Sequence, residues 1–116
     1  MPQLTTAYER FDVLTALFPF IDVPVRKPRP VMVLSNGAFN TANGHVVTAM
    51  ITTGASSRWP SDHPISGLAA AGLKHPSVVR CTLFTLPNTQ IGRRIGHLAA
   101  EDRAQLAVHF EAILHA

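Results

Sequence analysis

Cations rather than carboxylates are the side chains here that could act on a phosphate ester. The run Arg26-Lys27-Pro28-Arg29-Pro30 directly precedes an apolar segment. Each proline restricts the backbone before it to extended conformations, so we expect Arg29 on a stiff stem at the start of a strand. A stiff guanidinium loses little freedom on binding and can hold phosphate in a bidentate manner. The alternative is that charge and proline only protect a strand edge from aggregation.

Two adjacent hydroxyls form a second candidate group. Thr52 and Thr53 end a β-branched run and are followed by Gly54. Threonine hydroxyls can hydrogen-bond phosphate oxygens or a ribose. The competing interpretation is that β-propensity and a turn signal alone account for these residues.

Arg80 is the third candidate, because it lies inside the otherwise apolar segment 77–82. Burying an unpaired guanidinium is costly, so its side chain must meet a cleft, a partner or a carboxylate. Acids are scarce in this part of the chain, which favours an external anion. A salt bridge to an acid near either end of the chain is the alternative. Trp59 could stack on a base or close one end of a barrel.

The charge distribution also favours an anionic partner. Residues 23–97 hold eight basic side chains and a single acid, Asp62, a net charge of +7. Each end of the chain carries −2, which gives the overall +3. A basic middle predicts a polyanionic partner, nucleic acid first, or else a solvated basic face.

Composition excludes several classes of protein and site. The single Cys81 rules out an internal disulfide and multi-cysteine zinc frameworks, and the six histidines show no ligand spacing. With only Asp62 in the middle, two-metal phosphodiester chemistry has no ligands there, so we expect neither metal nor cofactor. No apolar run is long enough to span a bilayer and the first residues lack a signal-peptide core. We therefore expect a cytoplasmic protein without membrane segments.

The elements that must position these side chains are mostly short strands. The chain of 116 residues is expected to form one domain, residues 1–116. One apolar stripe at helical spacing, Leu106, Phe110, Ile113 and Leu114, predicts a C-terminal helix with a poor N-cap. Short strands followed by one helix predict a mainly β small barrel with a C-terminal α-helix. The expected strands cover 11–17, 30–35, 45–53, 77–82 and 95–98, with a short one near Ile65, turns at 36–37 and 43–44, and a helical turn within 87–94.

Taken in order along the chain, these segments resemble the PemK/MazF toxins. The likeness runs from about Tyr8 to Leu114 and is fairly specific only when its parts are taken jointly. It is carried by Phe11-Asp12-Val13, Phe18-Pro19-Phe20, Lys27-Pro28-Arg29-Pro30 with the strand after it, Phe39-Asn40, Ile51-Thr52, Ala71-Gly72-Leu73, Pro76-Ser77-Val78-Val79-Arg80, Ile95-Gly96-His97-Leu98 and the closing helix.

The resemblance implies an SH3-like barrel that forms a homodimer and cleaves single-stranded RNA without a metal. It implies attack by a ribose 2′-hydroxyl, with cyclic phosphate and 5′-hydroxyl products, and an antitoxin with an acidic, flexible tail. Arg29 matches a phosphate ligand, Thr52 a hydrogen-bonding partner near the scissile group, and Arg80 an arginine that protonates the leaving oxygen or stabilises the pentavalent phosphate. Substrate binding is assigned to Arg26, Lys27, Thr53, Trp59 and Thr82.

One position departs from the family pattern. The best-studied PemK-like members have an aspartate, the proposed general base, two residues after that arginine, and this chain has Thr82. A threonine hydroxyl is no base near neutral pH, so the base is unassigned and electrostatic stabilisation by Arg29 and Arg80 would supply most of the rate. A degenerate member that binds RNA or an antitoxin without cleavage stays open. So does a CcdB-like gyrase binder, although the ending Ile113-Leu114-His115-Ala116 argues against it.

Overall fold

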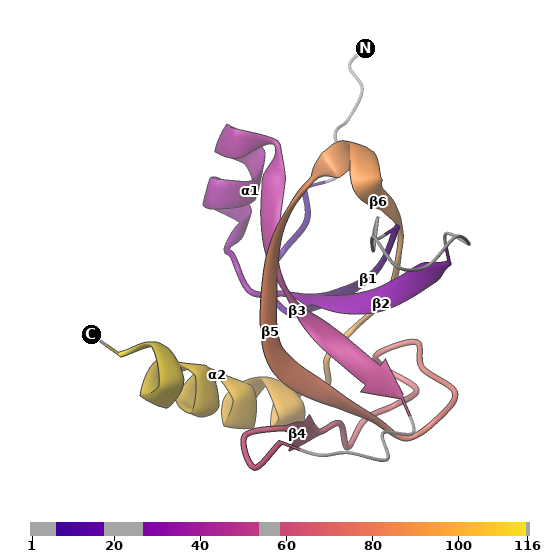
Figure 1. Cartoon of the computed structure of the whole chain (residues 1–116), viewed down its shortest axis with the longest axis vertical. Coiled ribbons are helices and arrows are strands. Elements are labelled where there is room, and N and C mark those ends of the chain that lie inside the picture. The colour runs from indigo at the N-terminus through magenta and orange to yellow at the C-terminus, as the bar shows by residue number, and fades with distance from the viewer. Residues whose placement is uncertain (1–6, 18–26, 54–58, 116) are drawn as a thin grey trace.

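Six antiparallel strands form one sheet in the part of the chain that this computed structural model describes, residues 7–17, 27–53 and 59–115. The strands are ordered β4-β5-β3-β2-β1-β6, and the sheet curls so that the β5–β6 hairpin arches over towards β1 (Figure 1). This mainly β architecture with a C-terminal helix confirms the predicted fold class. The strands are β1 (Asp12–Leu17), β2 (Pro28–Val33), β3 (His45–Thr53), β4 (His63–Pro64), β5 (Ser77–Pro87) and β6 (Ile91–His97).

The curled sheet has an apolar cluster on each of its faces. On one face Met32, Ala49 and Val79 pack with Leu106 and Phe110 of helix α2 (Ala100–Leu114), which lies against the sheet in Figure 1. The other cluster consists of Leu14, Ala16, Val31, Val33, Val46 and Leu86. Successive strand residues point to opposite faces, so β2 supplies both clusters and is fully buried at its end, from Val31 to Val33.

The segment between β2 and β3 is a helix, where the sequence predicted turns. Helix α1 (Gly37–Asn43) begins at Asn36, whose side chain accepts a hydrogen bond from the Phe39 N–H at 2.9 Å. Its end is marked by Gly44, with a φ of 61°. The two Asn-Gly pairs are therefore an N-cap and a left-handed C-cap rather than hairpin turns.

The second half of the sheet is longer than predicted. β5 runs five residues beyond the predicted end at Thr82, with a bulge opposite the step from Ala49 to Met50. Between β5 and β6 lies one 3-10 turn (Asn88–Gln90), which confirms the expected helical turn but shortens it. The short strand predicted near Ile65 is β4, two residues earlier.

Helix α2 is held in place by the contacts of a buried aspartate in its first turn rather than by an N-cap side chain. Ala99 gives no side-chain cap, as predicted. Instead Asp102, which is 0% exposed, accepts hydrogen bonds from the N–H groups of Ser66 and Gly67, both at 2.9 Å. Its Oδ1 also lies 3.1 Å from Nε2 of His63. Burial alone would raise the pKa of Asp102, but these hydrogen bonds and the His63 ring outweigh burial and lower it.

Two glycines allow the segment before β5 to run against β6 at backbone distance. Gly72 has a φ of +75°, and a Cβ there would lie 2.0 Å from the carbonyl oxygen of Ile95. A Cβ on Gly96 would lie 2.3 Å from the carbonyl carbon of Ala71. We call this contact the glycine seam, and it includes a hydrogen bond from the His97 N–H to the Ala70 carbonyl at 3.0 Å.

Neither of the α-helices among the described residues has the length and apolar character that a membrane span requires.

Candidate functional site

A cleft opens where β2 and β3 part. Their ladder ends at the pair Val31 and Met50, whereas β2 stays paired with β1 as far as Pro28 and β3 stays paired with β5 as far as Thr53. Two prolines in this end of β2 remove two N–H donors, which weakens further pairing. The resulting cleft has a volume of about 320 Å³ and is lined by Arg29, Pro30, Met50, Ile51, Thr52 and Thr53.

Arg29 supplies the charge of this cleft. Its side chain is exposed and forms no ion pair within the described part of the chain. None of the described residues that line the cleft is an acid. An exposed guanidinium without a carboxylate partner is an anion site, because its donors are available to an incoming phosphate.

The two threonines of the cleft differ in what their hydroxyls do. The Oγ of Ser77 donates to the His75 carbonyl at 2.8 Å, so the Thr53 hydroxyl, 3.2 Å from that Oγ, is the donor of their shared bond. The Thr52 hydroxyl forms no hydrogen bond with any described residue and is half-buried in the cleft wall. Thr52 can therefore donate to a ligand, whereas the proton of Thr53 is already used.

Arg80 is held by an internal carboxylate, contrary to the expectation of an external anion or an acid near the chain ends. Its Nε donates to Oδ1 of Asp62 at 3.0 Å and its Nη2 to Oδ2 at 2.8 Å. The guanidinium carbon lies 4.9 Å from the centroid of the Trp59 ring. The hydrogen bond to Asp62 raises the pKa of Arg80, so its side chain stays protonated.

Arg80 nevertheless lies on the cleft side of its strand. It pairs directly with Met50, which lines the cleft, and Thr52 is two residues further along β3. Directly opposed residues and those two positions along a strand share a face of the sheet. The register therefore brings Arg29, Thr52 and Arg80 to one face, and the cleft itself contains the first two.

The remaining predicted site residues are spread around this cleft. Trp59 is 45% exposed and stacked on Arg80 rather than buried in a barrel end. Lys27 is exposed just before β2, and Thr82 lies half-buried at the β5 bulge. Neither of these two is among the cleft-lining residues. Arg26 lies outside the described residues.

The sequence does not single out Asp62 as the partner of Arg80, although it is the lone acid among the eight basic residues of the segment 23–97. That isolation is a signal, because a single carboxylate among many cations favours an ion pair with one of them. The eighteen residues between Asp62 and Arg80 conceal the pairing.

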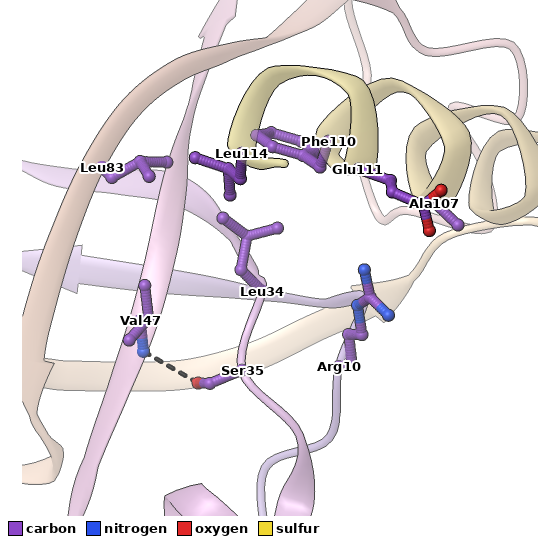
Figure 2. Close-up of a pocket in the computed structure, with 9 residues that line it drawn as sticks. All are labelled: Arg10, Leu34, Ser35, Val47, Leu83, Ala107, Phe110, Glu111 and Leu114. Atoms are coloured by element: carbon purple, nitrogen blue, oxygen red, sulfur yellow. Dashed lines mark hydrogen bonds between the residues drawn. The ribbon is translucent and has the colours of Figure 1, made fainter. Parts of the chain in front are cut away.

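A second hollow, of about 440 Å³, lies between helix α2 and the opposite face of the sheet. Figure 2 shows Leu34, Leu83, Phe110 and Leu114 gathered on it, with Arg10 and Glu111 towards one side. The Arg10 guanidinium carbon lies 4.8 Å from the Phe11 ring centroid. This hollow is mainly apolar. Its lining includes the Ser35 hydroxyl, but unlike that of Thr52 this hydroxyl already donates to Oδ1 of Asn40 and accepts from the Val47 N–H. In the described residues no three His, Cys, Asp or Glu side chains are grouped to hold a metal.

Comparisons with known proteins agree on one family. A family model described as the PemK-like, MazF-like toxin of type II toxin–antitoxin systems matches residues 9–114. Endoribonuclease MazF3 of Mycobacterium tuberculosis (strain CDC 1551 / Oshkosh) is 36% identical over 85 residues, which span 70% of this chain and 77% of MazF3.

Solved structures of proteins from this family have the same fold as this chain. The Mycobacterium tuberculosis toxin MazF-mt6 superposes with a TM-score of 0.70 at 29% identity, over 87% of this chain and 93% of that one. An endoribonuclease from a mycobacterial species, in complex with its cognate antitoxin, has a TM-score of 0.71 at 18% identity and covers 95% of both chains. At that identity the second likeness concerns the fold alone.

Proposed function

The chain belongs to the PemK-like, MazF-like toxins of type II toxin–antitoxin systems, and from this premise we propose that it is an endoribonuclease whose RNA site is the cleft between β2 and β3. The observation that carries the assignment is that the side chains of Arg29 and Thr52 line one cleft. Among the described residues neither side chain has a polar partner, and none of the cleft-lining residues is an acid. Residues 1–116 would act as one domain.

The proposed reaction needs no metal. The 2′-hydroxyl oxygen of a ribose attacks the adjacent phosphorus, the bond from phosphorus to the 5′ oxygen breaks, and the 2′-hydroxyl proton leaves while the 5′ oxygen gains one. The products are a 2′,3′-cyclic phosphate and a 5′-hydroxyl. Arg29 stabilises the charge that grows on the phosphoryl oxygens, and Thr52 donates a hydrogen bond near the same group.

Arg80 contributes charge rather than a proton in this proposal. Because its pKa is raised by Asp62, donation to the leaving oxygen is disfavoured. A protonated guanidinium one strand away from the cleft still stabilises the pentavalent phosphate electrostatically. Lys27 extends the positive surface at the start of β2, and Trp59, Thr53 and Thr82 would contact the RNA beyond the scissile phosphate. Arg26 is proposed as a further RNA-binding residue from its place in the sequence alone.

The proposal includes partners and a compartment. Single-stranded RNA would compete for the cleft with the acidic, flexible tail of a cognate antitoxin, because both present anions to Arg29. The matching family consists of toxins of type II toxin–antitoxin systems, and we infer an antitoxin for this chain as well. We also propose that the chain forms a homodimer and acts in the cytoplasm.

The test is incubation of the purified protein with single-stranded RNA in the presence of EDTA, followed by mapping of both new ends. We expect fragments with 5′-hydroxyl and 2′,3′-cyclic phosphate ends, and strongly reduced cleavage by Arg29→Ala. Intact RNA, or Arg29→Ala cleavage equal to wild type, would contradict the proposal.

A second candidate is a member that binds RNA or the antitoxin without cutting. The pairing of Arg80 with Asp62 favours it, because a paired guanidinium is less available to a phosphate. Under this candidate the wild-type protein retains RNA on a filter in EDTA but produces no new ends.

A further inference from the structure

The turn from Trp59 to Asp62 contacts the Arg80 guanidinium through both of its end residues. The turn is closed by two hydrogen bonds, from the Asp62 N–H to the Trp59 carbonyl at 3.0 Å and from the Trp59 N–H to Oδ2 of Asp62 at 2.9 Å. The same carboxylate accepts two bonds from the Arg80 guanidinium, and the Trp59 ring lies against that guanidinium. We call these three residues the clamp.

Little of the clamp's ion pair is open to water. The side chain of Asp62 is 3% exposed and that of Arg80 is 13% exposed. A bidentate pair fixes the plane of a guanidinium as well as its position. Partial burial strengthens the pairing and makes removal of one partner costly, because the other charge is then left desolvated. The clamp is therefore a rigid support rather than a surface contact.

The clamp is connected to the cleft through the sheet register. Arg80 stands opposite Met50 on β3, and Met50 lines the cleft beside Thr52. A cation held on that face keeps a constant position relative to Arg29 across the parting strands. Groups fixed before the substrate arrives stabilise a transition state without reorganising, which is the most effective form of electrostatic catalysis.

We propose that Asp62 is a positioning residue for the endoribonuclease reaction and acts by orienting the Arg80 guanidinium towards the RNA cleft. The inference rests on the proposed function, because it needs RNA cleavage as its readout. Asp62 touches neither the substrate nor the reacting atoms in this scheme. Its effect on the rate passes entirely through Arg80.

The experiment measures kcat and KM on one single-stranded RNA oligonucleotide that contains a site mapped with wild-type protein. For Asp62→Asn, which keeps the shape but loses the charge, we expect kcat to fall about tenfold with KM nearly unchanged. Asp62→Glu restores the carboxylate one methylene away and should recover part of the loss. In an Arg80→Ala background, Asp62→Asn should have no further effect on kcat.

The matched control is Asp12→Asn. Asp12 also forms an ion pair with an arginine, Oδ2 to Nη2 of Arg94 at 2.9 Å, and accepts a hydrogen bond from a backbone N–H, that of Glu9 at 2.8 Å. It lies on β1, away from the cleft lining. Its substitution should leave kcat at the wild-type value. Thermal melts of every variant confirm that the assayed protein is folded.

The outcomes separate this inference from the function on which it rests. Wild-type protein that does not cut RNA overturns both. Wild-type cleavage with kcat unchanged in Asp62→Asn overturns only the positioning role, and a higher kcat would show that Asp62 restrains Arg80 instead. If Asp62→Asn does not fold, Asp62→Ser decides, since a wild-type kcat in a folded variant without the carboxylate contradicts an orienting carboxylate. A further loss in the Arg80→Ala background would also contradict it.

Discussion

Polar side chains have opposite surroundings in the cleft between β2 and β3 and at Asp102, which with its hydrogen-bond partners forms what we call the anchor of helix α2. In the cleft, Arg29 is exposed and the Thr52 hydroxyl has no partner among the described residues. At the anchor, Asp102 is 0% exposed and receives bonds from Ser66, Gly67 and His63. Polar groups that are hydrogen-bonded within the protein stabilise the fold, whereas polar groups in a cleft that have no internal partner are available to bind a ligand. The contrast predicts which substitutions change stability and which change activity.

Asp102→Ala should give the largest effect and should act on stability alone. It leaves two backbone N–H groups and the buried His63 ring without their acceptor, and we expect the free energy of unfolding to fall by about 3–5 kcal/mol. Urea unfolding followed by circular dichroism measures the loss. A variant within about 0.5 kcal/mol of wild type would break the comparison, because the anchor would then contribute no more than a surface site.

Arg29→Ala should do the reverse. We expect RNA cleavage to fall about 100-fold, since one preorganised donor to a developing oxyanion is worth roughly that much. The urea midpoint should stay near that of wild type because the side chain is exposed and has no ion-pair partner among the residues that the structure describes. Arg10→Ala is the control, as Arg10 is an arginine of the second hollow. Equal losses in both variants would mean that overall charge, rather than position, governs cleavage.

Thr52→Val and Thr53→Val sharpen the comparison inside the cleft. Loss of the Thr52 hydroxyl should lower kcat about tenfold, because a hydrogen bond to a charged group is lost. Thr53→Val removes the donor to Ser77, so it should lower the melting temperature more than the rate. If Thr53→Val lowered kcat more than Thr52→Val does, the absence of an internal partner for the Thr52 hydroxyl would not identify the hydroxyl that binds RNA.

Lowering the pH should have the smallest effect of these changes, a partial loss of the stability that Asp102 contributes. The pKa of Asp102 is lowered in the folded state, whereas an unfolded aspartate titrates near 3.9. As pH falls the unfolded chain takes up this proton first, so the stabilisation is complete above about pH 5 and is lost as pH drops through the folded pKa. The difference in unfolding free energy between wild type and Asp102→Asn should therefore shrink from pH 6 to pH 3. A constant difference would contradict a charged anchor. The effect is modest because protonation leaves the carboxyl group packed in place.

Local patterns predicted most of the fold. The strand at 45–53 matches β3 at both ends, and the apolar stripe located α2 because its buried members Leu106 and Phe110 recur at helical spacing. Helix α1 was missed because Asn-Gly serves as a hairpin turn and also as the two caps of a short helix. Whether Asn36 caps a helix depends on its hydrogen bond to Phe39, which pattern alone does not reveal.

The candidate site was predictable in part. The proline-flanked Arg29 and the terminal Thr52 carry local signals, and they line one cleft. The difference between Thr52 and Thr53 depends on Ser77, a residue of the neighbouring strand. The partner of Arg80 depends on a turn eighteen residues earlier. Contacts of this kind are set by tertiary packing, which one sequence does not encode in any short window.

The glycine seam governs how β6 can be placed. A slip of β6 by one residue would put Ile95 or His97 where Gly96 now crosses Ala71, and their Cβ atoms would overlap the opposing main chain. Register errors at this edge of the sheet are therefore excluded by steric overlap rather than by a loss of favourable contacts. Because β6 closes on β1, whose other neighbour is β2, this exclusion also protects the alignment of the strand that carries Arg29.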